Sequence, residues 1–141
     1  MEKNNYFKLE FDAKNINEGF ARGVVALFAG QLSPTVSEIN DIKTAVSEAV
    51  TNAIVHGYNG KEGKIVMEAK IEDNRLDITI SDLGVGIDDI DMALQPFFTS
   101  KAEDEHSGMG FTLMDSFMNN LTVKQNNPSG VIVHMQKVIK K

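Results

Sequence analysis

The sequence contains no cysteine, which excludes disulfide bonds and thiolate metal sites and fits a reducing cytoplasm. It also lacks an apolar run long enough to span a membrane. The N-terminal segment MEKNNYFKLEF alternates polar and apolar residues, whereas a signal peptide would have an apolar core. We therefore expect a soluble, cytoplasmic protein that does not contact a membrane.

The sequence also has fewer basic than acidic residues. The chain has 14 Lys and Arg against 20 Asp and Glu, which gives a net charge of -6. Because nucleic acids and anionic membranes both attract positively charged surfaces, direct binding to either is not expected. Proteins and small molecules are the expected partners. With 141 residues, 42% of them hydrophobic, the chain can form one substantial core, so we treat 1–141 as a single domain.

Hydrophobic periodicity predicts eight regular elements. Alternating apolar residues predict strands at 6–11, 65–71, 76–81, 121–125 and 131–137. Intervals of three and four residues predict helices at 16–31, 36–57 and 111–118. The turn Asp73-Asn74 should join the second and third strands as an antiparallel hairpin. This order favours an α+β fold, a two-layer α/β sandwich with helices on one face of a mixed, mostly antiparallel sheet.

The first predicted helix should begin with a capping box, in which Asn15 is the N-cap and Glu18 lies three residues further on. Its expected buried stripe consists of Ile16, Phe20, Val24, Leu27 and Phe28. Arg22 is the only basic residue of this helix and falls on the flank away from that stripe, so we expect it to be exposed. An exposed arginine is usually only solvated, but arginine is also common at protein interfaces.

The second predicted helix carries three polar side chains, Glu48, Asn52 and His56, at four-residue intervals along one flank. A carboxylate that can accept a proton and an amide oxygen that can hold a hard cation suit metal-dependent phosphoryl transfer. A solvated helix face is the alternative, and it would be favoured if these residues stood alone.

The ends of this second helix also have sequence signals. Thr35 or Ser33 can serve as its N-cap, and Pro34 suits its first turn. Gly57 suits a left-handed C-terminal cap.

Asp82-x-Gly84-x-Gly86 follows the third predicted strand. A buried carboxylate at this position must be paired, and its oxygens match a hydrogen-bond donor such as the amino group of adenine. The two glycines would let the backbone approach a flat base or sugar. A strand-terminating turn with Asp82 as its capping residue is the alternative.

A long stretch with little periodicity extends from Asp82 to Gly110, which is typical of binding loops and lids. At its end, Gly108-Met109-Gly110 precedes a helix, and the backbone N–H groups at a helix start can bind phosphate. Lys101 could face the same phosphate. The alternatives are a plain helix-start turn and a solvated lysine.

Taken together, these patterns resemble the motifs of the GHKL ATPases. Within that superfamily, the segments SEAVTNAIVHGY, PFFTSK and HSGMGF are similar to those of the bacterial anti-sigma factor serine kinases of sporulation. The similarity extends from the first helix to the last strand. Three motifs stand in the family's order, with a long loop before the last: Glu48-x-x-x-Asn52, Asp82-x-Gly84-x-Gly86 and Gly108-x-Gly110.

The resemblance implies a GHKL (Bergerat) fold that binds ATP and Mg²⁺. It assigns the general base to Glu48, Mg²⁺ coordination to Asn52 and adenine recognition to Asp82. Further ATP contacts are implied for the other motif residues, which are His56, Gly84, Gly86, Thr99, Lys101, Ser107, Gly108, Met109 and Gly110, with Asn52 contacting both metal and nucleotide.

For function, the resemblance implies a protein serine/threonine kinase that binds and inhibits a sporulation sigma factor. It also implies phosphorylation of that factor's antagonist, an anti-anti-sigma factor, on serine. A homodimer and a partner contact at Arg22 are implied as well. A nucleotide-gated binding module without kinase activity is the alternative. Glu48 favours the enzyme, because a module that only binds has no need of a base.

Overall fold

The computed structural model describes residues 4–86 and 110–140 of the chain. Its helices are α1 (Ile16–Ala29), α2 (Val36–Asn52) and α4 (Gly110–Phe117), and its strands are β1 (Asn5–Asp12), β2 (Lys64–Glu72), β3 (Arg75–Asp82), β4 (Asn120–Gln125) and β5 (Val131–Val138). A 3₁₀ turn, Gly30–Leu32, follows α1, and a π-helical turn, Ala53–Gly57, follows α2.

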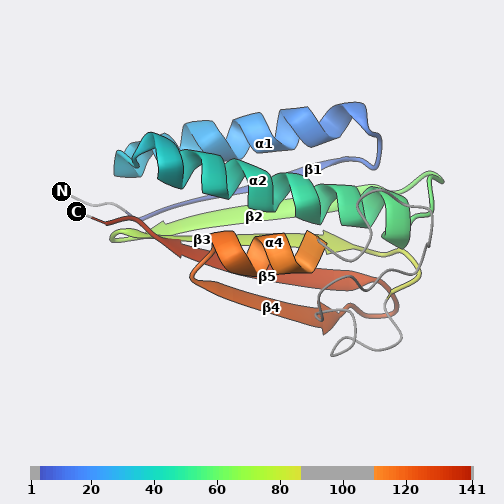
Figure 1. Cartoon of the computed structure of the whole chain (residues 1–141). Helices are drawn as coiled ribbons and strands as arrows, with labels where there is room; N and C mark the ends of the chain where they lie inside the picture. Colours follow the sequence, from blue (N-terminus) through green and yellow to red (C-terminus); the bar gives the residue numbers. More distant parts are fainter. Residues whose placement is uncertain (1–3, 87–109, 141) are drawn as a thin grey trace.

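The strands form one sheet in the order β1-β2-β3-β5-β4. The three helices lie on one face of it, and α2 packs against both α1 and α4 (Figure 1). The predicted two-layer α+β class is therefore confirmed. Every pairing between the described strands is antiparallel, so the sheet is not mixed. The two-residue turn Asp73-Asn74 joins β2 to β3 as predicted.

The core lies between the sheet and its helices. The strands supply fully buried side chains, among them Ile65, Ile78 and Met135, which belong to the same core cluster as Ile42 and Val46 of α2. The outward positions of the same strands carry mostly polar and charged residues. The described helices thus cover one face of the sheet and leave the other open, as expected for an antiparallel sheet with alternating strands.

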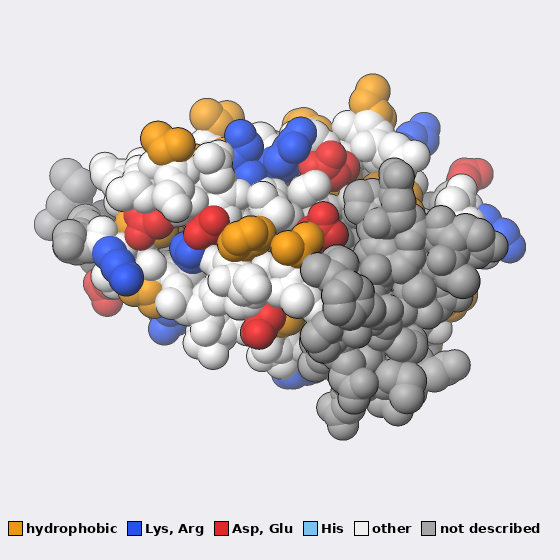
Figure 2. Space-filling model, in the orientation of Figure 1, with side chains coloured by type: hydrophobic (Ala, Val, Ile, Leu, Met, Phe, Trp, Pro, Cys, Tyr) orange, Lys and Arg blue, Asp and Glu red, His pale blue; other side chains and the backbone are white. Residues whose placement is uncertain are grey.

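The expected buried stripe of α1 is wrong for three of its five residues. Ile16 and Leu27 are each 82% exposed and Phe20 is 51% exposed. The buried side of α1 is instead Ala21, Val25, Phe28 and Ala29. Both sets have helical spacing, but the smaller side chains let α1 approach α2 closely. Figure 2 shows apolar side chains along the upper edge of the molecule, where α1 runs in Figure 1.

The helix starts differ from expectation in two details. Asn15 has helical backbone angles and makes no side-chain capping bond, so the predicted box with Glu18 does not form. At α2, Thr35 is the N-cap and forms a complete capping box with Glu38, while Pro34 lies before the cap and not in the first turn. Ser33 is left-handed, at φ 51°, and turns the chain into this cap.

The end of the second helix also differs. Its α-helical part stops at Asn52 and continues as the π-helical turn. Gly57 does not adopt a left-handed conformation, so it is not the predicted cap; Asn59 and Gly60, at φ 56° and 76°, reverse the chain instead. The Gly60 N–H donates to the Ile54 carbonyl at 3.1 Å. The helix therefore ends at an Asn-Gly pair, where positive φ costs little.

The α2 capping box gives a direct test of what starts this helix. The Thr35→Ala change removes the oxygen that accepts the Glu38 N–H at 3.0 Å and should lower the free energy of unfolding by about 1 kcal/mol. Ser37→Ala, an exposed position in the same turn, is the matched control and should change it by less than about 0.5 kcal/mol. Urea unfolding measures both variants, and equal stabilities would contradict the capping role.

Candidate functional site

Three chain segments meet where β3 ends. They are the π-helical turn, the loop at 83–86 and the connection at 126–130 between β4 and β5. Asp82, the last residue of β3, lies between them and is 6% exposed. Its Oδ1 accepts a hydrogen bond from the Gly84 N–H at 2.9 Å. The predicted buried carboxylate at the strand end is therefore present in the fold.

The π-helical turn and the loop after β3 are in backbone contact. The Val85 N–H donates to the Gly57 carbonyl at 2.8 Å. A Cβ on Gly57 would lie 3.0 Å from Oδ1 of Asp82, and a Cβ on Gly84 would overlap the Gly57 carbonyl. The absence of side chains at both glycines thus lets the helix end approach the Asp82 carboxylate closely.

The connection between β4 and β5 holds the same strand end from the other side. Asn126 Nδ2 donates to the Asp82 carbonyl at 2.8 Å, and Ser129 Oγ donates to the Leu83 carbonyl at 3.2 Å. Gly130 has φ 102°, and a Cβ there would overlap the Asp82 carbonyl. The backbone at Asp82 is therefore fixed by contacts from sequence-distant segments.

Tyr58 holds the loop at 83–86 through its hydroxyl group. Its hydroxyl accepts the Leu83 N–H at 2.8 Å and donates to the Lys64 carbonyl at 2.5 Å. A Cβ on Gly63 would run into the Tyr58 ring, so this glycine makes room for it. Tyr58 therefore joins the loop after β3 to the start of β2.

Six of these supporting residues were not among the predicted site residues in this role: Gly57, Tyr58, Gly63, Asn126, Ser129 and Gly130. The sequence signal was present only as turn composition, a cluster of Gly and Asn near Tyr58 and another between the last two strands. Turn composition does not indicate which loops meet, and that pairing gives these residues their importance.

Burial raises the pKa of Asp82, and the backbone N–H groups of Gly84 and Val131, which favour the charged form, offset part of this rise. A carboxylate held in such an environment gains from any further donor that reaches it. The amino group of a purine is a donor of that kind.

The flank of α2 forms the second part of the candidate site. Glu48 and Asn52, one helical turn apart, are both half-buried. A Cβ on Gly110 would lie 3.0 Å from Nδ2 of Asn52, so the first residue of α4 lies directly against this amide. The fold thus brings together residues from the first and last predicted motifs.

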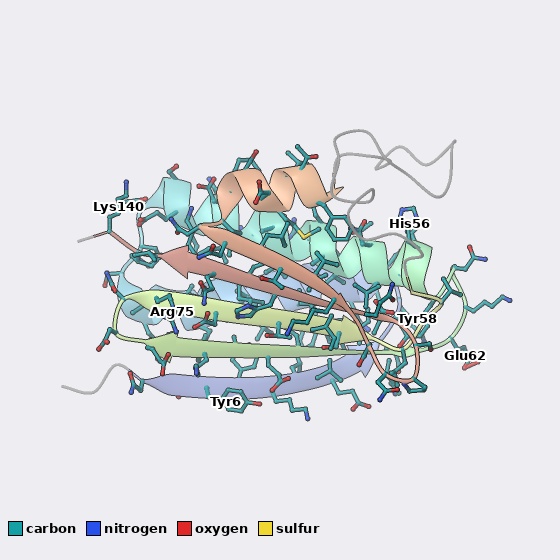
Figure 3. All side chains as sticks on the ribbon, turned by 90° about the horizontal axis from the view of Figure 1, so that it is seen from below. Tyr6, His56, Tyr58, Glu62, Arg75 and Lys140 are labelled. Atoms are coloured by element: carbon teal, nitrogen blue, oxygen red, sulfur yellow. The ribbon has the colours of Figure 1, made fainter. Side chains whose placement is uncertain are left out.

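His56 lies within the π-helical turn, where hydrogen bonds span five residues and each residue turns the chain by less than in an α-helix. It is half-buried. Figure 3 shows it at the same end of the molecule as Tyr58.

In the described part of the chain, no group of three or more His, Cys, Asp or Glu side chains could hold a metal ion. Mg²⁺ in nucleotide sites commonly has one or two protein ligands and takes the rest from phosphates and water. A single amide oxygen from Asn52 fits that kind of coordination. None of the described helices is both long and apolar enough to cross a membrane.

Five predicted nucleotide contacts, Thr99, Lys101, Ser107, Gly108 and Met109, lie outside the described residues.

Arg22 is described, and its side chain is 43% exposed. It is not isolated, because its Nε lies 3.4 Å from Oε2 of Glu18. Its position on α1 is on one flank, between the buried side and the exposed apolar row.

Comparison with known proteins adds the family. A model described as "Histidine kinase-like ATPase domain" matches residues 11–137. The chain is 52% identical over 139 residues to an anti-sigma F factor of Caldanaerobacter subterraneus subsp. tengcongensis, covering 99% of this chain and 97% of that protein. It is 50% identical over 133 residues to an anti-sigma F factor of Clostridium acetobutylicum, covering 94% and 93%.

Among solved structures, the nucleotide-free catalytic domain of the histidine kinase ThkA is similar, with a TM-score of 0.61, 20% identity, and coverage of 94% of this chain and 96% of that one. This likeness concerns the fold alone. The family match covers most of the chain, and relatives at about half identity cover nearly all of it. The chain therefore belongs to the histidine kinase-like (GHKL) ATPase family and, within it, to the group of proteins named anti-sigma F factor.

Proposed function

We propose that this protein is an ATP- and Mg²⁺-dependent protein serine kinase that also binds and inhibits a sporulation sigma factor. Its phosphoacceptor would be a serine of that factor's antagonist, an anti-anti-sigma factor, and it would act in the cytoplasm. The observation that carries the proposal is the convergence at one end of the fold of a buried carboxylate, Asp82, and of Asn52 against Gly110. The relatives named anti-sigma F factor support the regulatory part.

Asp82 is the proposed adenine contact. Its carboxylate is buried and would accept a hydrogen bond from the adenine amino group. The loop after it, from Gly84 to Gly86, would shape the pocket, since a Cβ on Gly84 would overlap the Gly57 carbonyl and one on Gly86 would meet Gln125, so both glycines keep the loop close to its neighbours. The raised pKa of Asp82 agrees with a site that gains from an added donor.

Glu48 and Asn52 are proposed to lie at the end of the site where the phosphoryl group is transferred. ATP would supply the phosphoryl group and Mg²⁺ would neutralise phosphate charge. Asn52 would hold the metal through its amide oxygen, and Glu48, one turn earlier on α2, would accept the proton of the substrate serine. Gly110, at the start of α4, would contribute its backbone N–H to the phosphates. The remaining proposed ATP contacts are His56, Thr99, Lys101, Ser107, Gly108 and Met109.

The exposed side of α1 supports a protein-binding role. Ile16, Phe20, Gly23 and Leu27 follow one another at intervals of four, three and four residues, the spacing by which helices contact each other in coiled coils. We propose that partner proteins dock here, with Arg22 at the border of this row, and that the protein forms a homodimer. A soluble monomer seldom exposes such a row without use.

A nucleotide-gated binding module without catalysis is the second candidate. The same pocket would then only bias which partner is bound. The position of Glu48, half-buried and one turn from Asn52, favours the kinase. Purified protein with labelled ATP, Mg²⁺ and the candidate antagonist tests the choice, because phosphoserine on the antagonist would form only with a kinase.

The Glu48→Gln change keeps size and removes proton acceptance. It should lower the phosphorylation rate by about 10²–10⁴-fold while ATP affinity changes little. The measurement is single-turnover phosphorylation of the antagonist. Glu10→Gln, at an exposed position on β1, is the matched control and should behave as wild type. A Glu48→Gln rate like that of wild type would remove the base assignment.

Base recognition and metal binding should separate in a pair of variants. Asp82→Asn keeps one acceptor oxygen but loses the carboxylate, and it should weaken ATP and ADP alike, by about tenfold or more. Asn52→Ala should weaken mainly the Mg²⁺-dependent part of ATP binding. Asn40→Ala, exposed on the same helix, is the control. Calorimetric titration with and without Mg²⁺ decides, and equal losses for Asn52→Ala under both conditions would contradict its metal role.

Arg22 gives the test of partner binding. If the sigma factor and the antagonist share this contact, they exclude each other, and Arg22→Glu should weaken both complexes by more than about 2 kcal/mol. ATP affinity should stay unchanged. Lys124→Glu, exposed on β4, carries the same charge change as a control. Titration with each partner checks this, and unaltered affinity for both would show that Arg22 is not the shared contact.

A further inference from the structure

Lys137 is a lysine on the helix-covered side of the sheet. Like Val131, Val133 and Met135, it occupies a position on β5 whose side chain faces the helices, and its side chain is only 13% exposed. Its ammonium donates to the carbonyl of Phe117 at 2.6 Å and lies 3.2 Å from Oδ2 of Asp41. One side chain of β5 thus contacts both α4 and α2.

An ammonium this far from water needs such partners, because an unpaired buried charge is strongly unfavourable. The Phe117 carbonyl is one of the last four of α4, and the last four carbonyls of a helix have no N–H donor within the helix. The negative end of the helix dipole lies at the same place and favours a cation. Lys137 therefore acts as a C-terminal cap for α4 that is itself tied to α2 through Asp41.

Helix α4 depends on contacts at its ends. It has eight residues, a length of about 12 Å, and helices this short are not stable alone. Its side chains in the core are Met114, which is fully buried, and Phe111, which packs against the same cluster partly buried. Its C-terminal end is held by Lys137 and its first residue, Gly110, lies against Asn52. Because the helix has only about two turns, we expect a shift of its C-terminal end to be passed on to Gly110.

The two ends of α4 point towards opposite ends of the sheet. In Figure 1, α4 lies over the middle of the sheet and runs from the side of the π-helical turn towards the side where the chain termini lie. In Figure 3, His56 and Tyr58 lie at the first end of the molecule and Arg75 and Lys140 at the other. The Lys137 contact is therefore separated from Gly110 by the length of α4 and is connected to the candidate site through this helix.

We infer that Lys137 is a positioning residue for the phosphate end of the nucleotide site. By holding the C-terminal end of α4 to α2, its ammonium keeps Gly110 beside Asn52. The inference rests on the proposed function, since it assumes that this end receives phosphates.

The adenine end of the site does not depend on this contact. The bonds that fix Asp82 and its loop come from Gly57, Tyr58, Asn126 and Ser129, and none of these residues belongs to α4. Loss of the Lys137 contact should therefore weaken the binding of phosphates and leave the binding of adenine unchanged. A general loosening of the fold would weaken both equally.

The test is a calorimetric titration of the full chain with Mg²⁺-ATP, and an NMR titration with adenosine as the weaker probe. Lys137→Met should weaken ATP binding about fivefold or more, the size of a modest coupling between sites. Its adenosine affinity should stay within about twofold of wild type. Lys137→Arg, which keeps the charge and the donors, should recover part of the ATP affinity. Lys124→Met, exposed on β4, should change neither ligand.

Asp41→Asn keeps the shape of the second partner and removes its charge, so it provides a milder variant if Lys137→Met does not fold. It should show the same separation with a smaller loss of ATP affinity. Wild-type affinities for both ligands in these variants, or equal losses for both, would overturn the inference. Failure of the wild-type protein to bind ATP would instead contradict the proposed function, and the inference would fail with it.

Discussion

The close approach of three backbone segments around Asp82 is the constraint on which the rest of the site depends. Gly57 and Gly84 come together only because neither has a side chain, and the bond from the Val85 N–H to the Gly57 carbonyl fixes them there. This approach buries the Asp82 carboxylate and determines where α2 must end. A side chain at Gly84 would separate the helix from the loop, since the Gly57 backbone that it would meet cannot yield as a flexible side chain can. A side chain at Gly57 would press on the Asp82 carboxylate.

α2 links the two halves of the site. Its buried side packs in the middle of the helical layer, and on its flank Asn52 lies against the start of α4. Its π-helical turn then brings Gly57 to β3. Such turns are often found at functional sites, where one extra residue per turn redirects the chain. Small movements of α2 would thus be felt at both ends of the proposed site, whereas movements of α4 would be felt at the proposed phosphate end.

The sequence predicted the fold well because each strand alternates and each helix has a clear period. It predicted Asp82, Asn52 and Gly110 as neighbours in function, and the fold brings Asn52 and Gly110 into contact. The stripe of α1 could not be predicted from hydrophobicity, because Ile16 and Leu27 are more apolar than Ala21 yet face outward. The roles of Tyr58 and Gly130 depend on which loops meet, and single-sequence patterns do not contain that information.

We propose that the junction at Asp82 and the contact between Asn52 and Gly110 are the two ends of one nucleotide site. A crystal structure of the protein with ADP and Mg²⁺ tests this most directly. We expect the adenine amino group within hydrogen-bonding distance of the Asp82 carboxylate, with the phosphates beside Asn52 and the start of α4. A nucleotide bound elsewhere, or one whose base does not reach Asp82, would contradict it.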